Sequence, residues 1–224
     1  MEINGIEVEL DLRYSEMNLS PGIMKALEQK GFTLATPVQG GAIPCFKDGK
    51  DVMAKAPTGS GKTFAFGIPM IEDTDPEGTD ITGLILAPTR ELALQIQDEL
   101  RALCAFLPGI RVACLYGGQP IDRQINTLKK RPQIIVATPG RLMDHMKRRT
   151  VRLGHVKTVV LDEADRMLDM GFIKDVIYIL KQIPNRKNLG LFSATISREV
   201  MDISWVYQRD PVEIVVSPVE ENKH

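Results

Sequence analysis

The chain has 224 residues, of which 43% are hydrophobic, and this suits one large α/β domain with a single core. Its acidic, alternating N-terminus is unlike a signal peptide, and no apolar run reaches the ~18 residues that cross a bilayer. Cys45, Cys104 and Cys114 lack the spacing of a metal site, so we expect small core side chains, a reducing compartment and a cytoplasmic protein without a membrane partner. The formal net charge of −1 does not by itself suggest a nucleic-acid partner.

Short apolar runs alternate with amphipathic stretches along the chain. The first helix is predicted to begin with Ser20 as N-cap and Pro21 in its first turn, and to end at Gly31. Further helices are predicted at 90–106 and 172–183. The predicted strands are 51–54, 83–87, 111–116, 133–137, 158–162 and 189–192, with a last strand within 210–218. This alternation predicts a mostly parallel sheet with helices on both faces, and the acidic stretch 72–80 is predicted to be a mobile loop.

Charge is distributed unevenly along the chain. Residues 129–157 contain nine Lys or Arg and one acid, Asp144, so this segment carries +8 and the remainder carries −9. Such asymmetry fits a local phosphate-binding surface on an otherwise acidic domain. Taken alone, it fits a solvated basic helix and its loops at least as well.

A glycine-rich segment follows the first predicted strand and opens a helix. Gly59 and Gly61 let backbone N–H groups turn toward phosphate oxygens, and the helix start adds the positive end of its dipole. Lys62 can reach the β- and γ-phosphates of a nucleotide, and the Thr63 hydroxyl can bind Mg²⁺. The alternative is a plain glycine turn at a helix start. The segment consists of Ala56, where the general P-loop pattern has Gly, and of Pro57, Thr58, Gly59, Ser60, Gly61, Lys62 and Thr63.

The apolar strand predicted at 158–162 ends in two acids, which a P-loop needs from a neighbouring strand. Asp162 is placed to hold Mg²⁺ through water, and Glu163 is placed to orient and deprotonate an attacking water. Two solvated acids at a strand end are the alternative, which the P-loop makes much weaker. Lys62, Asp162 and Glu163 are therefore the predicted catalytic residues.

Residues 162–165 read Asp-Glu-Ala-Asp, and beside the P-loop they make the sequence resemble the DEAD-box family of ATP-dependent RNA helicases, over residues 14–216. Further family motifs follow in order: the Q motif at 31–39, motif Ia at 88–93, the GG doublet at 117–118, motif Ib at 138–141 and motif III at 193–195. The resemblance implies a RecA-like P-loop NTPase domain over 1–216, with the Q motif region at 12–40. Residues 217–224 would begin a linker to a second RecA-like domain.

The resemblance implies a nucleotide site and a relay. Gln39, in a motif that includes Thr36, would read the N6 and N7 edge of adenine and reject guanine, unless it is a plain helix-surface residue. Phe32 or Tyr14 would stack on the base, unless either belongs to the core. Two departures from the family pattern are Ala35, usually Pro, and Tyr14, usually Phe. The relay between the ATP and RNA sites would consist of Asp165, Ser193 and Thr195.

An RNA site is implied as well. Backbone N–H groups and hydroxyls at strand ends and helix starts would hold the ribose-phosphate backbone without reading bases. Arg90 could instead be structural, paired with an acid. The residues implied are Pro88, Thr89, Arg90, Gly117, Gly118, Thr138, Pro139, Gly140 and Arg141.

The implied function is that of the ATP- and RNA-binding part of an RNA helicase. ATP and Mg²⁺ would be its cofactors, and hydrolysis would drive local duplex unwinding or remodelling of RNA–protein complexes. We expect a monomer. We also expect this part of the protein to lack unwinding activity on its own, because no segment after Thr195 resembles the family's arginine-finger motif. A GTPase is disfavoured, since no Asn-Lys-x-Asp segment exists. A nucleotide-dependent RNA-binding module without turnover stays open.

Overall fold

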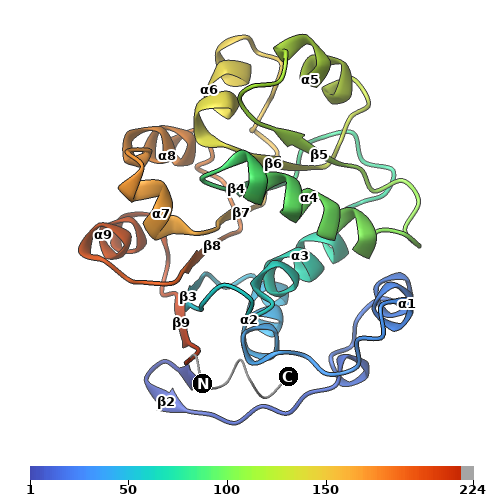
Figure 1. The fold of residues 1–224 in the computed structure, drawn as a ribbon, viewed down its shortest axis with the longest axis vertical. Coiled ribbons are helices and arrows are strands. Elements are labelled where there is room, and N and C mark those ends of the chain that lie inside the picture. Colours follow the sequence, from blue (N-terminus) through green and yellow to red (C-terminus); the bar gives the residue numbers. More distant parts are fainter. Residues whose placement is uncertain (218–224) are drawn as a thin grey trace.

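A nine-stranded sheet forms the centre of the computed structural model, which describes residues 1–217 (Figure 1). The linker predicted at 217–224 therefore lies, beyond its first residue, outside the described residues. In chain order the strands are β1 (Glu2–Ile3), β2 (Ile6–Glu7), β3 (Val52–Lys55), β4 (Gly83–Leu86), β5 (Val112–Leu115), β6 (Ile134–Ala137), β7 (Thr158–Leu161), β8 (Asn188–Ser193) and β9 (Val212–Val215). Their order across the sheet is β2-β1-β9-β3-β8-β7-β4-β6-β5.

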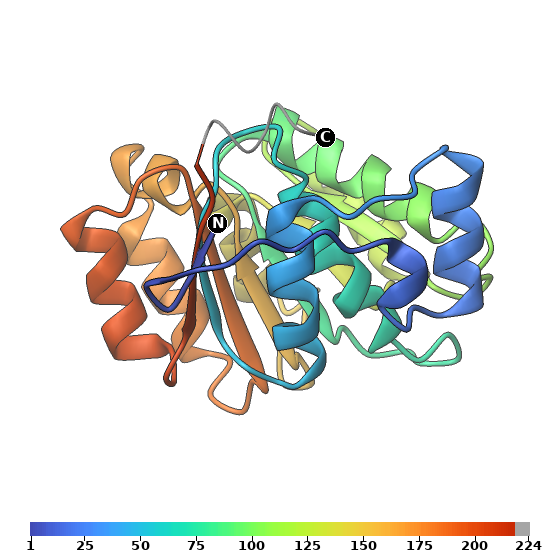
Figure 2. The ribbon, with the colours of Figure 1, turned by 90° about the horizontal axis from the view of Figure 1, so that it is seen from below.

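Helices connect the strands and cover both faces of the sheet. A 3₁₀ turn, η1 (Tyr14–Glu16), precedes α1 (Pro21–Gln29), α2 (Pro37–Lys47), α3 (Lys62–Glu72), α4 (Arg90–Leu103), α5 (Ile121–Leu128), α6 (Pro139–Lys147), α7 (Ala164–Asp169), α8 (Ile173–Lys181) and α9 (Arg198–Tyr207). In Figure 2, α1 to α4 lie on one side of the sheet, whereas α7 to α9 lie on the other. Within residues 1–217, no helix combines the length and apolar character needed to span a bilayer.

The pairing of the strands confirms the predicted mostly parallel sheet. All pairs from β3 to β9 are parallel, and β4 to β7 are wholly buried, as expected of apolar strands that are covered on both faces. One core cluster includes Phe66 and Phe192, whose rings meet edge to face at 5.2 Å, and the second lies under α6 to α9. The buried apolar runs thus determined the sheet.

An antiparallel hairpin at the N-terminus was missed by the sequence analysis. β1 pairs with β2 and with β9, so the hairpin extends one edge of the sheet. Asn4 and Gly5 form its turn with φ of 51° and 79°. An Asn-Gly pair is the usual signal of a two-residue hairpin turn, because both positions need positive φ. That signal was present in the sequence, although strands of two residues carry no periodicity.

The stretch 72–80 was predicted to be a mobile loop but is tied to the sheet edge. Glu72 is the last residue of α3. Gln133 Nε2 donates hydrogen bonds to the carbonyls of Asp75 and Gly78, at 3.1 and 3.2 Å. Arg111 Nη2 adds a third bond, to the Gly78 carbonyl at 3.0 Å. Acidic composition alone did not indicate these long-range bonds.

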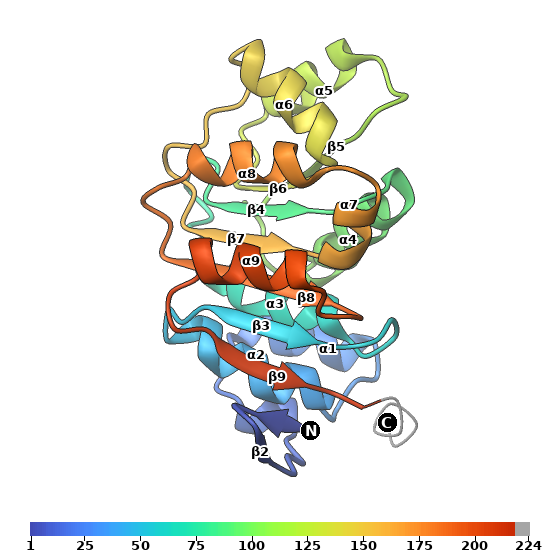
Figure 3. The same ribbon diagram turned by 90° about the vertical axis from the view of Figure 1, so that its left-hand side faces the viewer.

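Parallel strands bring the predicted motifs to one edge of the sheet, where β3, β7 and β8 all end (Figure 3). One expectation needs correction: the strand that ends at Asp162 is not the neighbour of the P-loop strand, because β8 lies between them. Adjacent strands are ~4.8 Å apart, so the two motifs start from backbones roughly 10 Å apart. This spacing leaves room between them for a phosphate group, and a lysine side chain can cross it.

At the other end of the parallel strands, where β3 begins, Asp51 should be important for stability. Its buried carboxylate accepts hydrogen bonds from the backbone N–H of Leu189 at 2.7 Å and of Arg209 at 2.6 Å. Asp51→Ala leaves both donors without this acceptor, so the free energy of unfolding should fall by roughly 2–4 kcal/mol in urea titrations. The exposed Asp48 provides the control, and Asp48→Ala should change it by less than about 0.5 kcal/mol. Equal effects of the two substitutions would contradict this account.

Candidate active site and nucleic-acid face

The P-loop adopts a conformation that requires its glycines. Gly59 and Gly61 have φ of 89° and 80°, and Gly61 is the N-cap of α3. A Cβ atom on Gly61 would lie 2.5 Å from Gln39 Nε2, so the loop packs directly on the Q motif. Ala56 is fully buried, and its N–H donates to the Ser193 carbonyl at 3.0 Å. The first position of the motif thus continues the sheet, where a small side chain fits.

A buried ion pair joins the P-loop to the DEAD motif. Lys62 Nζ lies 3.0 Å from Asp162 Oδ1, and both side chains are almost completely buried. The same oxygen accepts a hydrogen bond from the Glu163 N–H at 2.9 Å. Burial raises the pKa of the Asp162 carboxyl, and the Lys62 ammonium opposes that rise. The lysine therefore compensates the carboxylate when no phosphate is bound.

Two buried oxygens at this edge fit ligands that are not part of the chain. Asp162 Oδ2 and Ser60 Oγ have no hydrogen-bond partner within residues 1–217. Buried polar atoms without partners are rare unless water, an ion or a ligand satisfies them. Thr63, the predicted metal-binding hydroxyl, is partly buried in the first turn of α3. Carboxylate and hydroxyl oxygens are donors that suit Mg²⁺, so these residues fit the ion that was predicted.

Glu163 differs from Asp162 in exposure and backbone conformation. It precedes α7 with a φ of 49°, in the left-handed region that non-glycine residues rarely adopt. Such conformations are concentrated at functional sites. Its side chain is 20% exposed, with Oε2 at 3.8 Å from Arg166 Nη1, whereas the Asp162 side chain is fully buried. Solvent therefore reaches Glu163, as a residue that accepts a proton from water requires.

The structure brings together the three residues of the predicted relay. Thr195 donates to Asp165 Oδ2 from its N–H at 3.2 Å and from its hydroxyl at 2.8 Å. Asp165 in turn donates its own N–H to Ser193 Oγ at 3.0 Å. Burial acts to raise the pKa of Asp165, but the hydrogen bonds from Thr195 and its neighbours outweigh this and lower the pKa. Motif III at the end of β8 is thus bonded to the start of α7.

Gln39 is buried, not on the helix surface. Its Oε1 accepts hydrogen bonds from the Tyr14 hydroxyl at 2.5 Å and from the Thr36 N–H at 3.0 Å. Its Nε2 donates to the Gly61 carbonyl at 3.0 Å. Burial raises the pKa of Tyr14 to about 12, so its hydroxyl remains a donor at neutral pH. These bonds fix the carboxamide and leave one N–H hydrogen uncommitted.

The two aromatic residues predicted as stacking partners differ in position. Tyr14 is buried in the core, with a relative exposure of 3%. Phe32 is 47% exposed and touches the Phe64 ring edge-on, with centroids 5.9 Å apart. Ala35, where the family usually has Pro, is buried. Of the two rings, Phe32 alone offers a substantial face to a ligand.

The predicted RNA residues follow the carboxyl ends of β4, β5 and β6, which are adjacent in the sheet. Thr89 is the N-cap of α4, and its hydroxyl accepts from the Leu92 N–H at 3.2 Å. Thr138 is the N-cap of α6. Gly117, Gly118 and Gly140 are exposed, whereas Pro88 and Pro139 are buried. Backbone groups and hydroxyls are therefore presented along one edge, beside the nucleotide site.

The two arginines of this face, Arg90 and Arg141, contact other residues of the domain. The Arg90 guanidinium lies 4.9 Å from the centroid of the Tyr116 ring, and within residues 1–217 it has no acid partner of the kind that the structural alternative expected. Arg141 Nη1 donates to the Gln119 carbonyl at 2.8 Å. Its Nε also lies 3.7 Å from Asp144 Oδ2. The contact to Gln119 connects motif Ib with the GG loop.

A buried network that the sequence analysis missed supports this connection. His145 Nε2 lies 2.8 Å from Gln124 Oε1, which also accepts from Arg141 at 3.3 Å. Gln124 Nε2 donates to the Tyr116 carbonyl at 2.8 Å. Burial, reinforced by the Arg141 charge, lowers the pKa of His145 to about 4, so the ring is neutral at physiological pH. The signal was a polar residue on the inward face of each helix.

Comparison with known proteins decides the family. Residues 36–203 match the model of the DEAD/DEAH box helicase family. The chain belongs to this family. It is 47% identical over 209 residues to the ATP-dependent RNA helicase CshA of Limosilactobacillus reuteri, covering 93% of this chain and 42% of that protein. With the DEAD-box ATP-dependent RNA helicase CshA of Bacillus subtilis the identity is 46% over 211 residues, covering 94% and 42%.

Solved structures of DEAD-box proteins have the same fold. The crystal structure of a DEAD-box protein from Methanococcus jannaschii superposes with a TM-score of 0.88 and 43% identity, covering 94% of this chain and 57% of that chain. The chain thus spans less than half of the two curated relatives and somewhat more than half of the solved DEAD-box chain.

Removal of the buried lysine should destabilise this DEAD-box domain in a pH-dependent way. Lys62→Met leaves the Asp162 carboxylate buried without a cation, so the free energy of unfolding at neutral pH should fall by roughly 3–5 kcal/mol. Because burial raises the pKa of Asp162 in the folded state, its protonated form is neutral and better tolerated. Stability is then retained at pH below the unfolded value of about 4 and lost as pH rises through the folded pKa.

Urea unfolding of Lys62→Met between pH ~4 and ~8 measures this effect. Lys55→Met, at the exposed end of β3, is the control and should follow the unmodified chain. A Lys62→Met curve that runs parallel to the control at every pH would show that Asp162 is not the group concerned.

Proposed function

We propose that this chain is the ATP- and RNA-binding part of an ATP-dependent RNA helicase. The observation that carries the proposal is the meeting of Lys62 with Asp162 across the intervening strand, beside buried oxygens that lack partners. A phosphate-binding lysine and a metal-binding carboxylate in contact at one sheet edge are the arrangement that P-loop NTPases use. The names of the relatives, ATP-dependent RNA helicases, support the same activity.

The residues of the nucleotide site would have separate roles. Backbone N–H groups of the P-loop surround the phosphates, and Lys62 exchanges its contact with Asp162 for one with them. Thr63 and Asp162 would hold Mg²⁺, which when bound neutralises charge on the phosphate oxygens. Glu163, partly exposed and adjacent to Asp162, accepts the proton of the attacking water.

Gln39 would select adenine, and its contacts specify how. Its free Nε2 hydrogen suits the N7 acceptor, which adenine and guanine share. Discrimination requires Oε1 to accept from the adenine N6 amine, and that oxygen already accepts from Tyr14 and Thr36. The hydrogen of the Tyr14 hydroxyl can turn about the C–O bond and end its hydrogen bond to Oε1, whereas the Thr36 N–H is fixed by the backbone. Tyr14 is therefore the contact that we propose adenine replaces.

The RNA-binding edge would act on the sugar-phosphate backbone without selecting sequence. It presents the N-cap hydroxyls and exposed glycines described above, which contact phosphate and ribose rather than base edges. Asp165, bonded to Thr195, would transmit the state of the ATP site to this edge. We also propose that a second RecA-like domain supplies an arginine finger, so residues 1–224 alone would bind ligands without unwinding a duplex.

Nucleotide choice tests the adenine reader. Gln39→Ala should reduce the preference for ADP over GDP by roughly 1–3 kcal/mol, as expected when a two-bond contact to a base is removed. The measurement is calorimetric titration with both nucleotides, and their ratio is the readout because displacement of the P-loop would weaken both equally. Tyr14→Phe removes only the hydroxyl, so it should keep the preference and not weaken ADP. Equal affinity of the unmodified chain for ADP and GDP would refute this role.

Glu163 tests the chemistry separately from binding. In a protein that includes the second domain, Glu163→Gln should retain ATP and RNA binding while hydrolysis falls ~100-fold or more, since the amide cannot take a proton. Single-turnover hydrolysis with single-stranded RNA measures this step, and the exposed Glu199 offers Glu199→Gln as a control. Normal hydrolysis by Glu163→Gln would mean that another group is the base. No hydrolysis by the unmodified protein would favour a binding module without turnover.

A further inference from the structure

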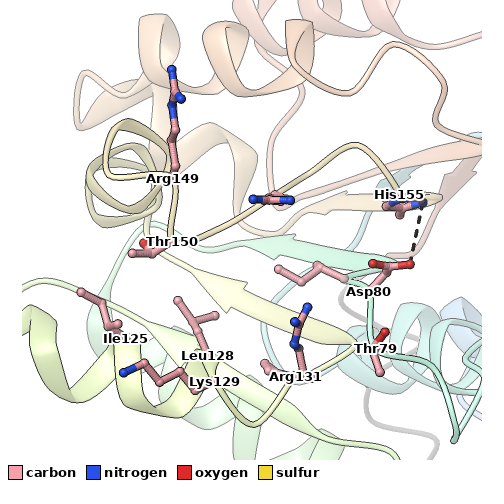
Figure 4. A pocket seen from close by; sticks show the side chains of 12 residues that line it. Thr79, Asp80, Ile125, Leu128, Lys129, Arg131, Arg149, Thr150 and His155 are labelled. Atoms are coloured by element: carbon pink, nitrogen blue, oxygen red, sulfur yellow. Dashed lines mark ion pairs between the residues drawn. The ribbon is translucent and has the colours of Figure 1, made fainter.

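A cavity of about 540 Å³ lies far from the nucleotide site, at the end of the sheet where β4, β6 and β7 begin. Three segments line it: the end of α5 with the turn that follows, the segment between α6 and β7, and the residues before β4 (Figure 4). Leu128 and Pro132 are buried side chains of its wall. We call this cavity the basic pocket.

Cations dominate the basic pocket. Lys129, Arg131, Arg149 and Arg152 line it and are exposed, and none of them forms an ion pair in the described part of the chain. The one acid of the lining, Asp80, lies 3.9 Å from His155 Nδ1. In Figure 4, Arg131 stands between the α5 segment and Asp80, while Arg149 extends away at the rim. Uncompensated cations around a concave surface favour an anionic ligand.

Two of these arginines occupy strained backbone positions. Arg131 and Arg149 both have φ of 58°, in turns that follow α5 and α6. Glycine or asparagine is usual in the left-handed residue after a helix, because a Cβ atom is disfavoured there. Both arginines at the rim of this cavity therefore occupy backbone positions where glycine would be less strained. Backbone strain of this kind is characteristic of functional positions.

The basic pocket lies at the far end of the two helices that start at the proposed RNA-binding edge. α5 follows the GG loop, and α6 begins at its N-cap Thr138. With 8 and 9 residues, these helices are about 12 and 14 Å long, and they lie side by side in Figures 1 and 3. Exposed Lys147 and Arg148 at the end of α6 continue the positive charge toward the pocket. An RNA strand bound at the proposed RNA-binding edge would need only a few more nucleotides to reach the basic pocket.

We propose that the basic pocket binds phosphodiester groups of RNA that extends beyond the segment held at the carboxyl edge. The proposal rests on the proposed function, since it adds a second contact to the same RNA. RNA is favoured over an acidic peptide because the pocket lies beyond the surface that we propose faces RNA. Arginine guanidinium groups also match phosphate oxygens, and the apolar wall of Leu128 and Pro132 can accept a ribose or base.

Binding of two RNA lengths to the full 224-residue chain tests the proposal. A single strand of about 6 nucleotides covers the carboxyl edge alone, and one of about 20 nucleotides reaches the pocket. The triple variant Arg131→Gly, Arg149→Gly, Arg152→Ala removes three cations and relieves two left-handed positions, so its melting temperature should not fall. The matched control replaces three exposed lysines by Ala: Lys30, the C-cap of α1, and Lys174 and Lys181 on α8.

The triple variant should bind the long RNA roughly fivefold more weakly, near 0.1 M salt, for each phosphate group that it no longer neutralises. The slope of log affinity against log salt should shrink by about 0.7 for each such phosphate. Affinity for the short RNA, and both affinities of the control, should stay unchanged. Asp80→Asn should have the opposite effect and strengthen long-RNA binding, because it removes the single acid of the lining.

Unchanged long-RNA binding by the triple variant would overturn the proposal. An equal fall for both RNA lengths would also overturn it, since the arginines would then act through the overall field of the domain. Oligoglutamate binding that is sensitive to the triple variant, with long-RNA binding unaffected, would assign the pocket to a protein partner instead. If the unmodified chain bound neither RNA, the proposed function itself would fail, and the short RNA distinguishes that result.

Discussion

The contact between Lys62 and Asp162 is the constraint on which the site depends. Burying two charges is costly, and the pair is tolerated because each compensates the other at 3.0 Å and a backbone N–H also donates to the carboxylate. The pair can still accept a ligand, since Asp162 keeps one oxygen without a partner in the described part of the chain. A phosphate can replace the Asp162 carboxylate as the partner of Lys62. A metal cation can likewise replace Lys62 as the partner of Asp162. Ligand binding thus exchanges compensated charges and exposes none.

Strand order makes that contact possible and links it to the other motifs. Because β8 separates β3 from β7, its last residues lie between the P-loop and the DEAD motif. Ser193 therefore accepts from the Asp165 N–H while its own carbonyl accepts from the Ala56 N–H. One residue at the end of one strand is bonded to both motifs. On the other side of the P-loop, Gln39 donates to the Gly61 carbonyl, so the proposed adenine reader and the P-loop are in direct contact. A displacement of Gln39 would therefore also shift the P-loop, and a displacement of the P-loop would shift Gln39.

Local chemistry made much of this predictable from the sequence. Buried apolar runs placed seven strands, and glycines with a lysine and paired acids located the site, because each pattern has a short-range physical cause. Pairing across the chain had no such local signature. Nothing in the segments themselves indicated that β8 would lie between β3 and β7, or that Gln133 would hold the loop at Asp75. The buried pair of Gln124 and His145 was missed for the same reason, since its partners come from different helices.

In the proposed RNA-binding surface, the groups that would position RNA and the cations that would attract it lie in different places. At the carboxyl edge, Arg141 is committed to Gln119 and Arg90 lies against Tyr116, so the groups available there for the proposed RNA contact are largely hydroxyls and backbone N–H groups. Such groups fix the register and path of a strand, but the electrostatic part of affinity comes from cations that displace counterions. Three exposed arginines without ion pairs in the described part of the chain, Arg131, Arg149 and Arg152, line the basic pocket at the other end of α5 and α6. In the proposed function, an edge that orients RNA can then release it when the ATP site changes, because the charge proposed to attract RNA does not depend on that edge.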